Sequence, residues 1–152
     1  MVPVKRYLYC PKHACLILVL NTGRMNELNL LQLQHESETW NRSLNMMNDE
    51  IIRFKTRLSE VLRTGFDNSL LNDLEHFQTR FLEADEWIII LRNELAEMNM
   101  LMIRVKHEQE QLQPKLEPFT NLMRKHIAVV QDKFNQLQSA FNVFLSASIL
   151  YQ

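Results

Sequence analysis

Glycine, proline and cysteine are scarce in this sequence. Its 152 residues include 2 glycines, 4 prolines and 2 cysteines, although 46% of the chain is hydrophobic. Sandwiches and barrels need many tight turns, which glycine and proline supply, so the composition disfavours them. It also excludes a disulfide-stapled, disordered or collagen-like protein. One domain with a substantial hydrophobic core is the expectation that remains.

An excess of charge of either sign is also missing. The chain has 17 basic and 18 acidic residues, which gives a net charge of -1. Nucleic-acid-binding domains usually carry a marked basic excess, so we expect no nucleic-acid partner. The only glycines, Gly23 and Gly65, cannot form a phosphate-binding loop, and no serine lies in a Gly-x-Ser-x-Gly turn. The sequence therefore predicts no enzyme and no cofactor.

Residues 1–24 differ in character from the rest of the chain. They contain both cysteines, several basic residues and no acidic residue. Their apolar run 15–20 is too short to span a bilayer, and no small-x-small cleavage site follows it. We interpret residues 1–24 as a tail or an over-extended start outside the fold. The single domain is expected over residues 25–152, in a cytoplasmic protein with no membrane span.

The apolar residues from position 28 onward recur in alternating steps of three and four. This spacing places them on one stripe of a helix, as packed helices require. Breaks are expected at Gly65, which suits a helix end, and at Pro114 and Pro118, because proline disrupts a helix interior. The pattern predicts three helices, at about 28–63, 68–112 and 115–151.

Each predicted helix carries one main apolar stripe, which we call its seam. Short connections force neighbouring helices to run antiparallel. The expected fold is all-α, an elongated antiparallel three-helix bundle (up-down-up) with coiled-coil heptad seams. The first seam is Leu30, Leu33, Ser37, Trp40, Leu44, Met47, Ile51, Phe54, Leu58 and Val61; the second is Leu70, Leu74, Phe77, Phe81, Ala84, Ile88, Leu91, Leu95, Met98, Met102, Val105, Gln109 and Leu112; the third is Leu116, Thr120, Met123, Ile127, Val130, Phe134, Leu137, Phe141, Phe144, Ser148 and Tyr151.

Helical bundles often hold metal ions between inward-facing carboxylates and histidines. The seams contain neither residue type, so no metal is expected. Asp73 and His76 have the i, i+3 spacing of a ligand pair, but they flank the second seam. A metal- or ligand-binding bundle that acts as a sensor or oxidoreductase through these two residues, His107 or His126 is the alternative function.

The second and third predicted helices carry more apolar residues than a three-helix core can cover. A second periodic stripe that includes small residues is typical of helix-on-helix association. On the third helix, a widened intramolecular contact would also explain it. The predicted function is a non-enzymatic protein–protein interaction or self-association module, with a homodimer or a partner helix. The candidate interface comprises Leu82, Ile89, Ala96, Met100, Ile103, Val129, Ala140, Val143, Ala147 and Leu150.

Trp40 occupies a seam position one half-heptad after the small residue Ser37. If the first two helices pair about a turn at Gly65, Trp40 should lie level with residues 88–91. Its replacement by alanine would then cost about 3–5 kcal/mol, as for other large-to-small core changes. Trp87 flanks the second seam, so the loss there should be smaller.

Overall fold

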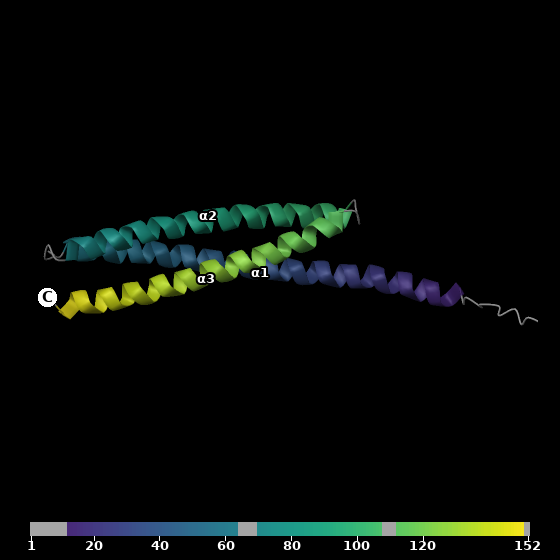
Figure 1. Cartoon of the computed structure of the whole chain (residues 1–152), viewed down its shortest axis with the longest axis horizontal. Helices are drawn as coiled ribbons and strands as arrows, with labels where there is room; N and C mark the ends of the chain where they lie inside the picture. Colours follow the sequence, from purple (N-terminus) through teal and green to yellow (C-terminus); the bar gives the residue numbers. More distant parts are fainter. Residues whose placement is uncertain (1–11, 64–69, 108–111, 151–152) are drawn as a thin grey trace, which may run out of the picture. The chain divides into compact units, whose positions relative to one another are not determined.

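The computed structural model describes the backbone of residues 12–63, 70–107 and 112–150, and side chains from residue 29 to residue 148 within these segments. Within the described segments there are three helices and no strand (Figure 1). They are α1 (Lys12–Arg63), α2 (Leu71–His107) and α3 (Gln113–Leu150). The expected all-α fold built from three helices is confirmed.

The main difference from the expected helix bounds is at the start of α1. This helix begins at Lys12 instead of near residue 28. The added segment contains three leucines, which favour helix, and its single glycine costs only about 1 kcal/mol in a helix interior. The chain divides into two compact units between His35 and Glu36, and the second unit contains the rest of α1 together with α2 and α3. The interpretation of residues 1–24 as a tail stays a prediction.

α1 and α2 run antiparallel. Three polar pairs join them, and the sequence separation of the pairs falls from 62 to 47 to 30 residues toward the connecting turn. Only helices of opposite direction bring together residues whose separation shrinks in this way. The pairs are Ser37 with Asn99 (2.6 Å), Asn45 with Arg92 (2.9 Å) and the ion pair of Lys55 with Asp85.

α3 returns antiparallel to α2. Glu94 Oε2 lies 2.8 Å from His126 Nδ1, and the Lys133 ammonium lies 4.5 Å from the ring centre of Trp87. The earlier residue of α2 thus meets the later residue of α3. The up-down-up order of the prediction is therefore correct.

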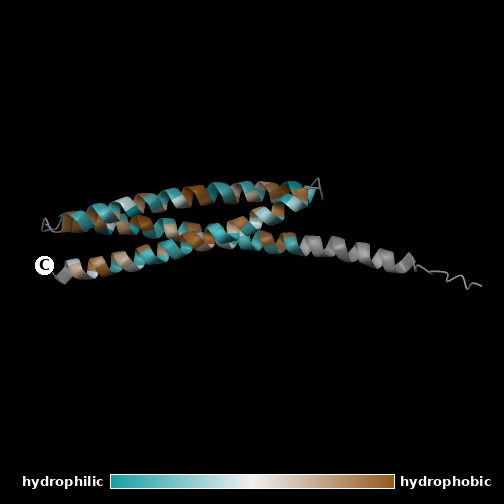
Figure 2. Cartoon of the chain, in the orientation of Figure 1, coloured by the Kyte–Doolittle hydropathy of each residue, from teal (hydrophilic) through white to brown (hydrophobic). Residues whose placement is uncertain are grey.

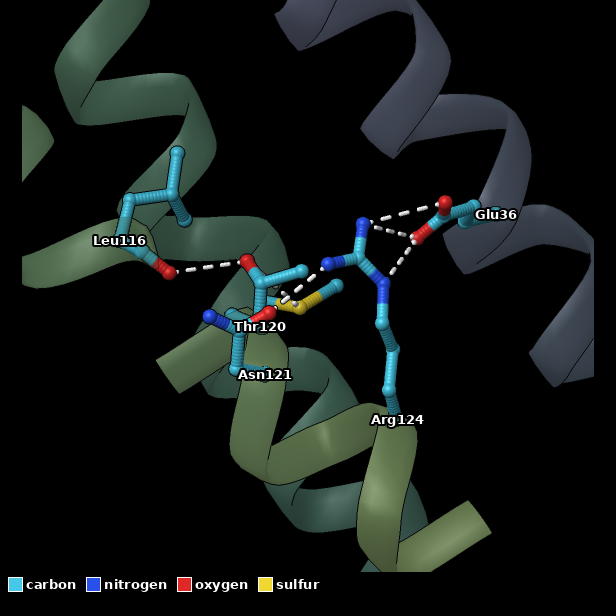
Figure 3. Close-up of polar contacts among 6 residues, drawn as sticks. Glu36, Leu116, Thr120, Asn121 and Arg124 are labelled. Carbon is cyan, nitrogen blue, oxygen red and sulfur yellow. Dashed lines mark hydrogen bonds and ion pairs between the residues drawn. The ribbon is translucent and has the colours of Figure 1, made fainter. Parts of the chain in front are cut away.

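A bidentate ion pair joins α1 directly to α3 (Figure 3). Arg124 Nε donates to Glu36 Oε2 at 3.0 Å and Nη2 donates to Glu36 Oε1 at 3.1 Å, while Arg124 Nη1 donates to Asn121 Oδ1 at 2.9 Å. Two parallel N–H···O bonds fix the guanidinium plane, so this contact is more specific than a lysine pair would be. This ion pair joins α1 and α3 near one end of the bundle. Further along, Phe54 and Phe141 join the same two helices, with their ring centres 5.1 Å apart.

The seams form the core. Every side chain that is buried in the described part of the chain belongs to one of the three seams, and every described seam member is at least half-buried. The buried set includes three polar residues, Ser37, Thr120 and Ser148, and each hydroxyl is hydrogen-bonded. The alternating spacing thus identified the core correctly. Gln109 and Tyr151, the remaining seam members, lie outside the described side chains.

The core is aromatic at one end and aliphatic at the other. Six phenylalanine rings from all three helices contact one another with ring centres 5.0 to 6.3 Å apart. Toward the turn between α2 and α3, the core instead contains Met98 and Met123, both fully buried, and the hydroxyl of Thr120, which donates to the Leu116 carbonyl at 2.8 Å. The aromatic residues are Phe54, Phe77, Phe81, Phe134, Phe141 and Phe144.

The predicted position of Trp40 relative to α2 is wrong. Its neighbours Ser37 and Asn45 contact Asn99 and Arg92, so Trp40 is level with the segment between those two residues and not with residues 88–91. Its side chain is only half-buried, because an indole is too large for the interior of a narrow bundle. Trp87 is also half-buried and packs against the core. The prediction that Trp40→Ala lowers stability more than Trp87→Ala therefore no longer follows.

Pro118 lies inside α3, although proline was expected to mark its boundary. It has no N–H to donate to the Pro114 carbonyl, and its ring crowds that carbonyl. We expect Pro118→Ala to raise the free energy of unfolding by about 1–2 kcal/mol, which is the helix penalty of proline less the entropy that proline removes from the unfolded chain. Urea denaturation followed by circular dichroism measures the change.

Pro114 provides the matched control. It is also exposed, but it lies at the second position of α3, where a backbone N–H has no partner in the helix. Pro114→Ala should therefore change stability by less than about 1 kcal/mol, and in the destabilising direction. Equal gains from both substitutions would show that Pro118 destabilises α3 no more than Pro114 does.

Candidate interaction surface

Most of the candidate interface residues are exposed to solvent. The largest exposed fractions are 71% for Val143 and 63% for Met100. Ala140 is an exception, because it is half-buried and packs against the core. The side chain of Leu150 lies outside the described residues. The exposed members are Leu82, Ile89, Ala96, Met100, Ile103, Val129, Val143 and Ala147.

Four of these residues lie along one line on α2. Figure 2 shows apolar residues at intervals along this helix. We call this set the α2 edge: Leu82, Ile89, Ala96 and Ile103. Its members are seven residues apart, so they stay nearly aligned over about six turns of helix. Leu82, Ile89 and Ile103 are 55%, 56% and 54% exposed.

The α2 edge borders α1. Its members alternate with Asp85, Arg92 and Asn99, the three residues of α2 that contact α1. Each edge residue lies three before or four after one of these contacts, which places it on the same side of the helix. The edge therefore lies beside the line along which α1 and α2 meet.

Ile52 of α1 belongs beside this edge, and the sequence analysis missed it. It is 55% exposed, lies three residues before Lys55 and follows Asn45 by seven, so it is on the side of α1 that faces α2. Sequence spacing did not identify it, because the residues at seven-residue spacing on either side, Asn45 and Ser59, are polar. Only the pairing of Lys55 with Asp85 shows that Ile52 and Ile89 lie near each other.

Two charged residues of α2 beside the α2 edge, Asp85 and Arg92, already have partners on α1. Lys55 binds Asp85, and Arg92 Nη2 donates to Asn45 Oδ1. Covering an unpaired charge would cost several kcal/mol, whereas these groups keep their partners when a helix covers them. An apolar helix that lies along this line therefore leaves Asp85 and Arg92 with their partners.

The stripe on α3 lies on a different edge. Val129 is three residues after His126 and four before Lys133, both of which contact α2. The stripe therefore borders α2, beside Ile90, which is 54% exposed and was also missed by the sequence analysis. Gln136 interrupts it between Val129 and Val143. The structure thus does not bring the α2 and α3 stripes together on one surface.

A groove of about 370 Å³ lies between α1 and α3. Met46 and Phe134 supply its apolar part, while Asp49 and the ion pair of Glu50 with Arg53 make the rest polar. Ligand sites are usually concave and mostly apolar with a few convergent polar groups. The mixed lining of this groove does not resemble such a site.

The residues of the alternative function are spread over the bundle. His76 and His107 lie near opposite ends of α2, roughly 45 Å apart at the rise of a helix. Asp73 and His76 are exposed, and His126 contacts Glu94. Among the described residues, no three His, Cys, Asp or Glu side chains are grouped so that they could hold a metal ion.

The described helices are also not suited to cross a bilayer, since none combines sufficient length with sufficient apolar character. No protein-family model, curated protein or solved structure matches the chain.

Proposed function

We propose that the protein is a non-enzymatic protein–protein interaction module whose α2 edge binds the apolar face of a partner helix. The observation that carries this proposal is the regular exposure of Leu82, Ile89, Ala96 and Ile103 at every seventh position. Isolated exposed hydrophobic residues are common, but an aligned row is typical of a binding surface.

The energetics support helix-on-helix binding. Complete burial of a leucine or isoleucine side chain contributes about 1.5–3 kcal/mol, and the large residues of the α2 edge still expose about half of that surface. Ala96, near the centre of the row, lets a second helix approach closely. The partner should therefore present its own apolar residues at heptad spacing. The heptad spacing of the seams also favours coiled-coil packing within the bundle. A cytoplasmic location stays a prediction.

Ile89→Glu tests the proposal directly. A carboxylate in the middle of the α2 edge would have to lose water when a helix covers it, so we expect binding to fall at least ten-fold. The measurement is affinity capture of partners from host extract, with bound proteins quantified by mass spectrometry. Binding that is unchanged by Ile89→Glu would rule out the α2 edge.

Val143→Glu is the matched control. It also places a carboxylate at an exposed apolar position, but on α3 and away from the α2 edge. It should leave capture unchanged. Equal losses from both variants would indicate a general effect of added negative charge.

A further inference from the structure

We propose that the helix bound by the α2 edge is α2 of a second copy of this chain, in antiparallel orientation. This inference rests on the proposed function and adds the identity of the partner. The starting observation is the uneven charge of α2. Its last turn carries Arg104, Lys106 and His107. Its first half is acidic, with Asp73, Glu75, Glu83, Asp85 and Glu86 against the single base Arg80.

The helix dipole does not account for this distribution. Its favourable effect on charged side chains is limited to the first and last turns. Asp73 lies in the first turn of α2, but Glu83, Asp85 and Glu86 lie more than two turns further along. Asp85 already binds Lys55, so it is the carboxylates of Glu83 and Glu86 that favour an external cation near the first half of α2, and the basic end of another α2 supplies one.

Glu86 and Arg104 are the two charges placed to act across the α2 edge. They are eighteen residues apart, which is about five full turns, so both lie on one side of α2. Glu86 follows Leu82 by four residues, and Arg104 follows the exposed Met100 by four. Both are exposed, and neither forms an ion pair with any residue that the structure describes.

Two antiparallel copies of α2 would join these charges. A two-fold axis near residues 94–95 places Glu86 of each copy level with Arg104 of the other, and symmetry makes this contact twice. In the same register Ile89 faces Met100 of the second copy, and the small Ala96 lies beside the axis. A parallel pair would instead place like charges opposite each other, which is unfavourable. The charges therefore select the antiparallel orientation.

A charge exchange tests this arrangement. Sedimentation velocity of the full chain at micromolar to hundreds of micromolar concentration should show a monomer–dimer equilibrium. Glu86→Arg and Arg104→Glu each replace two attractions by two repulsions, so each should raise the dissociation constant on the order of ten-fold. The double variant restores the opposite pairs and should return the dissociation constant to that of the unmodified chain. Single losses without restoration would overturn the register.

Cysteine cross-linking tests the orientation independently. In a chain with Cys10→Ser and Cys15→Ser, Ala96→Cys lies close to its own copy across the two-fold axis. Gln78→Cys, exposed and four residues before Leu82 on the same side of α2, lies roughly 50 Å from its copy. A short bis-thiol reagent should cross-link only the Ala96→Cys protein into dimers. Cross-linking of both proteins, or of neither, would overturn the antiparallel pairing.

The results separate this inference from the proposed function. A protein that stays monomeric at hundreds of micromolar overturns the homodimer. If Ile89→Glu then still abolishes capture of a different protein, the α2 edge keeps its proposed function with another partner. If Ile89→Glu changes neither sedimentation nor capture, both proposals are wrong.

Discussion

Phe141→Ala should lower the free energy of unfolding by about 5 kcal/mol, at the upper end of the range for removal of a buried aromatic ring. Phe141 has no exposed surface. Its ring centre lies 5.1 Å from that of Phe54, 5.2 Å from Phe77 and 5.0 Å from Phe81. Each such pair contributes about 0.5–1.5 kcal/mol beyond its buried area. Because these rings belong to α1 and α2, the substitution would leave a cavity where all three helices meet.

Phe119→Ala provides the comparison within the same helix. Phe119 is only half-buried and makes no ring contact with the residues that the structure describes. Phe119→Ala should lower the free energy of unfolding by about 1–2 kcal/mol, since the half-buried ring of Phe119 buries less apolar surface than the ring of Phe141 does. Urea denaturation of both variants measures the difference. Equal losses would mean that the phenylalanine cluster is not the most stabilising part of the core.

The helix spacing was sufficient to predict the core because burial in a helical bundle depends mainly on local periodicity. A residue such as Ile51 is fully buried, while Ile52 beside it is 55% exposed. One step along the chain rotates a side chain by about 100° around the helix, so neighbouring identical residues have different environments. That rotation needs no knowledge of the other helices, and the sequence therefore contains it.

The register between neighbouring helices could not be predicted in the same way. An antiparallel pairing about Gly65 would place Trp40 near Leu91, whereas the contacts of Ser37 and Asn45 place it further along α2. The register is revealed by polar pairs such as Lys55 with Asp85, whose members are distant in sequence. The same long-range information shows which helix each exposed stripe borders. For that reason the sequence predicted the exposed residues of the α2 edge but missed Ile52.

The run of three isoleucines in α2 gives the sharpest test of these assignments. Ile88 is 2% exposed, whereas Ile89 and Ile90 are 56% and 54% exposed. Ile88→Glu would place a carboxylate in the core beside aliphatic and aromatic side chains. We expect it to cost at least about 4 kcal/mol and to leave much of the protein unfolded, because no cation is available there to pair with the charge.

Ile89→Glu and Ile90→Glu should change stability by less than about 1 kcal/mol, since both side chains reach water and glutamate forms helix at least as well as isoleucine. Thermal and urea denaturation measures the stability of the three single variants. All three carry the same chemical change, isoleucine to glutamate, within one helical turn. Similar losses at all three positions would mean that α2 does not present the seam through Ile88 to the core. If only Ile88→Glu unfolds the protein, a loss of binding in Ile89→Glu can be attributed to the α2 edge, because the fold of that variant is intact.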